Sequence, residues 1–170
     1  MSNPLSMYSL SIPALKRALG NLAQILDKAA AHCASKGIDP AVLVAARLAP
    51  DMLPLSKQVQ IASDMSKGCA ARLSGVEPPA YEDTETTFEQ LQQRIARTLE
   101  YIGSVDAAAF DGAETRSITI KLRGEPQQFD GLQYLQYFVL PNVYFHCTTA
   151  YAILRHNGVQ LGKADFLGKP

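Results

Sequence analysis

Four long stretches of the chain repeat apolar residues every three or four positions, which is the spacing of one face of an α-helix. We expect these helices at about 9–35, 51–73, 86–102 and 132–156. The first stretch shows the pattern most clearly, in Ile12, Leu15, Leu19, Leu22, Leu26, Ala29 and Cys33. A short extra helix should follow Asp39, whose side chain can cap it while Pro40 takes the first helical position. The fourth stretch is apolar nearly all round and should be the most buried.

The ends of these helices are predicted from glycine, proline and capping residues. Three of the long helices should end at glycines, namely Gly37, Gly75 and Gly158. Asp51 is the expected N-cap of the second helix, and Thr86 with Glu89 has the capping-box pattern for the third. Pro141 should kink the fourth helix, because proline has no backbone N–H to donate.

Between the third and fourth helices, residue types alternate around a glycine turn at Ser117–Phe129, which predicts a small β-hairpin. The chain is therefore predicted to be all-α, a four-helix bundle with a short extra helix and this hairpin. Residues 1–170 are expected to form a single domain. Because two of the connections between long helices exceed a tight turn, an up-down-down-up order is as compatible with the sequence as simple up-down.

Charge and cysteine content narrow the functional classes. The chain has 16 basic and 16 acidic residues, so no charge excess points to nucleic acid. The basic residues Arg94 and Arg97 fall on predicted solvent faces. Three cysteines without a CxxC pattern favour a reducing, cytoplasmic location over a disulfide framework. No signal peptide or membrane-spanning stretch is expected.

The candidate site lies in the fourth helix, where polar groups interrupt an apolar segment. Asn142 and His146 are one turn apart in the middle of its core stripe, and His156 lies at the stripe's edge. On the second helix, the residues three, four and seven positions after Gln58 are apolar, whereas those after Gln60 are polar. We therefore expect Gln58 to face the core, Gln60 to face solvent, and Asp51 to share the face of Gln58.

A buried polar group without a partner costs on the order of 1–3 kcal/mol. Gln58, Asn142 and His146 should therefore meet one another, a water molecule or a ligand. A structural hydrogen-bond network and a functional pocket or metal site are both compatible with this pattern. Cys147 follows His146 directly, but neighbours on a helix point about 100° apart, which disfavours a Cys–His nucleophile pair.

Three runs resemble a bacterial family known only as a domain of unknown function: GIDPAVLVAARLAPDMLPLSKQVQIASD, FDGAE and PNVYFHCTTAYAILRHNGVQLGKADFLG. That family is similar to the DinB/YfiT-like superfamily of helical bundles, which includes mycothiol-dependent maleylpyruvate isomerase. The resemblance implies a four-helix bundle, often dimeric. It also implies a divalent metal bound by three histidines, one on the second helix and two spaced by four on the fourth.

The residues that would hold this metal are only partly present. His146 fits the second histidine of the fourth-helix pair, Asn142 stands where the first would be, and Gln58 is nearest to the second-helix position. Zinc and nickel favour imidazole and thiolate over amide oxygen, so the set His146, Asn142 and Gln58 should hold such a metal weakly.

The leading hypothesis is a cytoplasmic, homodimeric bundle that binds a small molecule and contacts neither nucleic acid nor membrane. Its pocket would be bounded by Gln58, Asn142, His146, Asp51 and His156. One alternative is a metal- or thiol-dependent transferase or isomerase that uses His146. The other is a purely structural or interaction protein with a sealed core.

Overall fold

The computed structural model describes residues 5–169 and is mostly helical, with one small antiparallel sheet. The long helices are α1 (Met7–Lys36), α3 (Leu55–Ser74), α4 (Phe88–Ser104) and α6 (Leu140–His156). The shorter elements are α2 (Pro40–Val44), η1 (Ala107–Phe110), η2 (Ala113–Thr115), β1 (Ile118–Leu122), β2 (Glu125–Phe129), α5 (Gly131–Gln133), η3 (Tyr134–Val139) and α7 (Lys163–Leu167). The predictions of a mostly helical fold and of a hairpin before the last long helix are confirmed.

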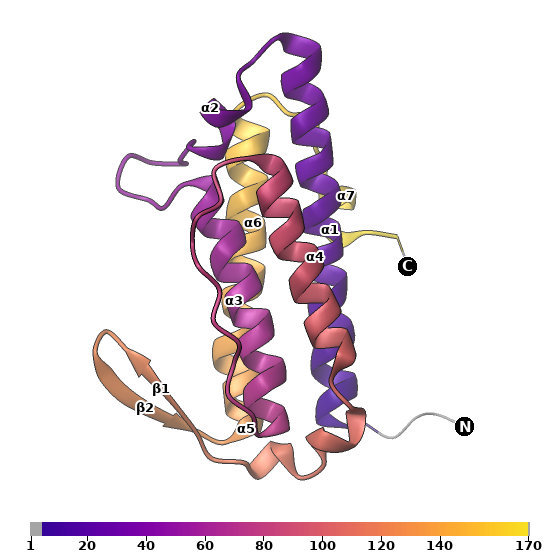
Figure 1. Ribbon diagram of the computed structural model, residues 1–170, viewed down its shortest axis with the longest axis vertical. Helices are drawn as coiled ribbons and strands as arrows, with labels where there is room; N and C mark the ends of the chain where they lie inside the picture. The colour runs from indigo at the N-terminus through magenta and orange to yellow at the C-terminus, as the bar shows by residue number, and fades with distance from the viewer. Residues whose placement is uncertain (1–4, 170) are drawn as a thin grey trace.

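The long helices lie side by side in an up-down-down-up order (Figure 1). α1 rises, α3 and α4 both descend, and α6 rises again. Because α3 and α4 run in the same direction, residues 75–87 must return along the outside of the bundle; we call this segment the strap. Its thirteen residues can reach roughly 43 Å when extended, which exceeds the roughly 30 Å length of the 20-residue α3.

The core is formed by the predicted apolar stripes. All seven stripe positions named for the first helix are buried, and α3 contributes Leu55, Val59, Ala62, Cys69 and Leu73. The three cysteines are buried and make no disulfide, as expected for small apolar core residues. On the hairpin, Ile118 and Ile120 point into the core, while Thr119 and Lys121, which alternate with them, are exposed.

Two predicted helix starts are wrong. α3 begins after Pro54 rather than at Asp51, and the first helical N–H, that of Leu55, donates to the carbonyl of Ala46 at 2.9 Å. Backbone from the α2 region therefore replaces a side-chain cap. α4 is capped by Thr87 with Gln90, not by Thr86 with Glu89.

The helix ends at Gly37, Gly75 and Gly158 are confirmed, since all three glycines have positive φ, of 66°, 81° and 94°. The last long helix runs almost continuously through α5, η3 and α6. η3 is a π-helical segment in which the N–H of Leu140 donates to the carbonyl of Leu135. This irregular turn directly precedes Pro141, where a disturbance of the helix was expected.

Candidate functional site

His146 on α6 and Gln58 on α3 face each other inside the bundle. The distance between Nδ1 of His146 and Oε1 of Gln58 is 2.7 Å. Their exposed fractions are 9% and 2%, so the contact is almost entirely shielded from water. The predicted contact between the imidazole and an amide of the neighbouring helix is therefore confirmed.

A second hydrogen bond sets the orientation of the pair. The amide nitrogen of Gln58 donates to the carbonyl of Leu53 at 2.9 Å, which turns its oxygen toward the ring. Nδ1 of His146 must then carry the hydrogen, and Nε2 of the neutral ring is an acceptor. Burial lowers the pKa of His146 below its usual value, because the charged form would lose hydration.

The acceptor Nε2 of His146 takes no part in the contact with Gln58. It makes no hydrogen bond to residues 5–169. The imidazole lies beside the half-exposed ring of Phe145, whose centroid is 5.2 Å from its own.

The other predicted site residues, Asn142, Asp51 and His156, make no hydrogen bond to His146 or Gln58 in the described part of the chain. Asn142 is only partly buried, and its amide donates to the carbonyl of Phe138, four residues earlier, at 2.6 Å. Asp51 is exposed in the turn before α3, and His156 is exposed at the end of α6. The expected trio is thus a pair, because Asn142 satisfies its amide on its own helix instead.

The donor set does not fit the zinc or nickel site that the fold resemblance implies. It contains one imidazole, and the Gln58 oxygen is already occupied by the histidine ring. Among residues 5–169, no group of three or more His, Cys, Asp and Glu side chains is placed to hold a metal ion. The adjacent Cys147 cannot act as a nucleophile near neutral pH, because burial raises the pKa of its thiol to about 12.

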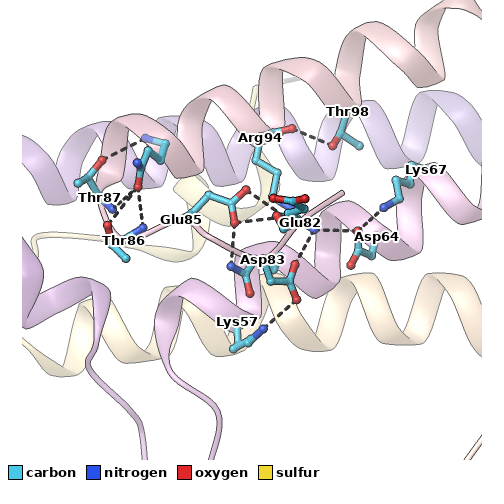
Figure 2. Close-up of polar contacts among 12 residues, drawn as sticks. Lys57, Asp64, Lys67, Glu82, Asp83, Glu85, Thr86, Thr87, Arg94 and Thr98 are labelled. Carbon is cyan, nitrogen blue, oxygen red and sulfur yellow. Dashed lines mark hydrogen bonds and ion pairs between the residues drawn. The ribbon is translucent and has the colours of Figure 1, made fainter. Parts of the chain in front are cut away.

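A second polar cluster, which the sequence did not predict, joins α3, α4 and the strap (Figure 2). Arg94 on α4 was expected to face solvent but is only 4% exposed. Its Nη1 donates to Glu85 at 3.0 Å and to the carbonyl of Glu82 at 3.0 Å. Its Nη2 lies 2.9 Å from Asp64 and 3.0 Å from Asp83, so one guanidinium contacts three carboxylates.

Lysines and an amide complete the cluster. Lys57 pairs with Asp83 at 2.8 Å, and Lys67 pairs with Asp64 at 2.6 Å. Gln60, which was expected to face solvent, is 2% exposed because the strap covers it, and its amide nitrogen donates to Glu85 at 2.8 Å. Position on the helix face alone could not reveal this burial.

The ring of Tyr81, in the middle of the strap, also contacts cations of the bundle. Nζ of Lys67 lies 4.0 Å from the ring centroid and Cζ of Arg97 lies 4.1 Å from it, both within the range of cation–π attraction.

One sequence signal could have suggested this surface. The strap carries Glu82, Asp83 and Glu85 within four positions, and such a run needs nearby cations if it packs on the bundle.

Electrostatics within the cluster favour the charged forms of its carboxylates. Burial alone would raise the pKa of Glu85, but hydrogen bonds from Arg94, from its own backbone and from Gln60 outweigh it and lower the pKa. For Asp83, burial is likewise outweighed by hydrogen bonds and charge from Lys57 and Arg94, so its pKa is also lowered. The cluster therefore holds the strap most strongly when these groups are ionised.

The surface also carries an apolar groove between α1, α6 and α7, with a volume of about 530 Å³. Its walls include Ala14, Ala18, Tyr144 and Phe166. A polar pocket of about 320 Å³ lies beside the strap and is lined in part by Arg94. His146 lines neither of these.

Comparisons with known proteins cover nearly the whole chain. The model of a domain of unknown function, DUF1993, matches residues 7–167. The chain is similar to the crystal structure of a DinB family member protein from Shewanella denitrificans, at 42% identity and a TM-score of 0.90. That match covers 96% of this chain and 92% of the other. No match was found among the curated proteins. No helix within residues 5–169 is long and apolar enough to cross a membrane.

Proposed function

Because the chain belongs to the DUF1993 family, a domain of unknown function with a DinB-like helical fold, we propose that it binds a small molecule through His146 without a metal ion. The observation that supports this is the 2.7 Å bond between His146 and Gln58. It fixes the ring and leaves Nε2 as a neutral acceptor with no hydrogen bond to residues 5–169. Such an acceptor suits a ligand with an O–H, N–H or S–H donor and an apolar body that packs on Phe145.

Metal-free binding is supported by the donor set. A zinc or nickel ion would need further imidazole, thiolate or carboxylate ligands. Gln58 and Asn142 instead bond to His146 and to the carbonyl of Phe138. Elemental analysis of protein purified without a histidine tag should therefore find no stoichiometric zinc or nickel. One metal ion per chain that is lost in His146→Ala would contradict metal-free binding.

The binding role is tested first by chemical access to the ring. Diethyl pyrocarbonate acylates neutral imidazoles that it can reach, and mass spectrometry locates the products. We expect modification of His146, with the exposed His156 as the internal positive control. A His146 ring that stays unmodified in the folded protein would support the sealed structural core instead.

A thermal-shift panel of small phenols, alcohols and thiols then tests binding. A ligand that uses Nε2 should raise the unfolding temperature of the wild type and of His156→Phe, but not that of His146→Phe. A shift that persists in His146→Phe would place binding elsewhere on the protein.

The second candidate function is a thiol-dependent transferase or isomerase. It is favoured by the same atom, because a neutral Nε2 can accept the proton of a bound thiol as the thiolate attacks an electrophile. The protein's own Cys147 is excluded from this role by its raised pKa. Turnover of glutathione with an aromatic chloride should then fall at acid pH with the protonation of His146. Equal turnover in His146→Gln would rule the reaction out.

We further propose that the chain forms a homodimer through the outer face of η3 and α6. No charged residue occurs among the 24 residues 131–154, yet Tyr137, Phe145 and Tyr144 are 71%, 56% and 42% exposed. The outer face of α4, by contrast, carries Glu89, Arg97 and other charged residues. Charge depletion with aromatic enrichment is typical of interface cores.

A second copy suits this face because an uncharged, aromatic strip matches itself across a two-fold axis. The strip is roughly 36 Å long. A standard interface buries roughly 800 Å² per partner, which the strip would supply together with the adjoining groove. Light scattering should give twice the 18.4 kDa chain mass for the wild type. Tyr137→Glu should give the monomer and Arg97→Glu the dimer; a monomeric wild type at high micromolar concentration would contradict the proposal.

A further inference from the structure

Three buried polar atoms without hydrogen-bond partners lie in the seam between α3 and α4. They are Oε1 of Gln60, Oγ of Ser63 and Nε of Arg94, and among the fully buried side-chain nitrogen and oxygen atoms of residues 5–169 these alone lack partners. The residues are 2%, 0% and 4% exposed. Buried polar groups in native proteins are nearly always hydrogen-bonded, so three exceptions in one seam call for a common explanation.

Two of the three side chains, those of Gln60 and Arg94, meet beneath the strap. The amide nitrogen of Gln60 and Nη1 of Arg94 both donate to the carboxylate of Glu85, at 2.8 and 3.0 Å. Asp64, the neighbour of Ser63, accepts from Nη2 of Arg94 at 2.9 Å. Gln60 and Ser63 are three positions apart on α3, so their side chains lie on neighbouring parts of one helix face.

The charges of the seam restrict what could bind there. Arg94 is already balanced by Asp64, Asp83 and Glu85, so a further anion would meet three carboxylates. A cation would meet the guanidinium itself. Only a neutral ligand avoids both repulsions.

The hydrogen-bonding types restrict it further. Nε–H of Arg94 can only donate, Oε1 of Gln60 can only accept, and the hydroxyl of Ser63 can do either. We propose that one buried water molecule binds here, accepting from Arg94, donating to Gln60 and exchanging a third hydrogen bond with Ser63. Buried waters commonly make about three such bonds to otherwise unsatisfied groups. The strap closes this site, because Glu85 and Asp83 hold Arg94 and Gln60 in place from outside.

A crystal structure at a resolution that shows ordered waters tests the site directly. We expect one water oxygen within about 3.2 Å of all three atoms. Side chains that bond to one another without a water, or a site with no water density, would overturn the proposal.

The stability of Ser63→Ala gives an independent test with a predicted sign. If the hydroxyl bonds to a water, its removal should raise the unfolding equilibrium constant by about fivefold, although alanine is the better helix former. If the hydroxyl has no partner, its removal should instead stabilise the protein. The control is Ser66→Ala, because Ser66 is also fully buried on α3 but already donates to the carbonyl of Ala62 at 2.8 Å. Ser63→Ala that is more stable than the wild type, while Ser66→Ala is less stable, would refute the water site.

Discussion

Replacement of Arg94 by methionine should destabilise the protein far more than the same replacement of its exposed neighbour Arg97. Methionine keeps the aliphatic stem of the side chain but removes the guanidinium. Three carboxylates, those of Asp64, Asp83 and Glu85, would then lose their common partner. The strap would lose its main attachment to α4, while the packing of α1 and α6 would be untouched.

The magnitude follows from how deeply each carboxylate is buried. Removing one partner of a buried ion pair typically costs about 3–5 kcal/mol, because the remaining charge is left uncompensated. The side chain of Glu85 is 12% exposed, but those of Asp64 and Asp83 are 34% and 39% exposed and can regain water. We therefore expect the lower end of the range, about 3 kcal/mol.

Urea denaturation followed by far-UV circular dichroism measures this loss, with Arg97→Met as the matched control. Arg97 lies one turn further along the same helix and is exposed, and its cation–π contact with Tyr81 is worth about 0.5–1 kcal/mol. The difference between wild type and Arg94→Met should also narrow at acid pH. The pKa values of Asp83 and Glu85 are lowered in the fold, so their stabilisation is present above their ordinary values of 3.8 and 4.5 and is lost as the pH falls below them.

A loss below about 1 kcal/mol, or one equal to that of Arg97→Met, would refute this reasoning. It would mean that the carboxylates of the strap are held by solvent and lysines rather than by Arg94. A loss that does not change between neutral and acid pH would likewise show that charge is not its cause.

Three other changes give defined outcomes. Gln58→Leu should cost about 1–3 kcal/mol in urea denaturation, because Nδ1–H of His146 loses its acceptor, and adding His146→Phe should restore part of the loss. Burial lowers the pKa of His146 below 6.5, so just below that pH the unfolded chain binds more protons than the folded protein. The free energy of unfolding should therefore fall as the pH drops from 7 through 6.5, and it should level off below the pKa of the folded state. His146→Gln should remove that part of the pH dependence, and a parallel pH profile in the variant would contradict the assignment. Gly131→Ala should cost about 1–3 kcal/mol of stability, because the added Cβ would meet the backbone carbonyl of Ala113. Gly20→Ala should instead stabilise the protein by about 0.5–1 kcal/mol, because nothing lies within 4 Å of the added Cβ. Equal urea midpoints for the two glycine variants would show that the backbone around Gly131 and Ala113 can shift to accommodate the added Cβ.

Part of the candidate site could be predicted because it depends on single-helix geometry. Gln58 and His146 each lie on the apolar face of their own helix, and two such faces must meet in the core. Asn142 lies one turn before His146, but its amide donates to the backbone carbonyl of Phe138, four residues back, instead. Helix periodicity shows which way a side chain points and does not show which acceptor it reaches.

The sequence by itself determined the helices, their apolar stripes, the glycines at which three of them end, and the hairpin before the last one. These features depend on residues within a few positions of one another, so a local pattern is enough to specify them. The tertiary structure alone decided the burial of Arg94 and Gln60. Both residues lie on polar helix faces, for which the sequence pattern predicts exposure to solvent. They are buried only because α4 runs parallel to α3, so that the acidic strap must return over both helices. That placement depends on the direction of a distant helix, which no periodicity along the chain encodes.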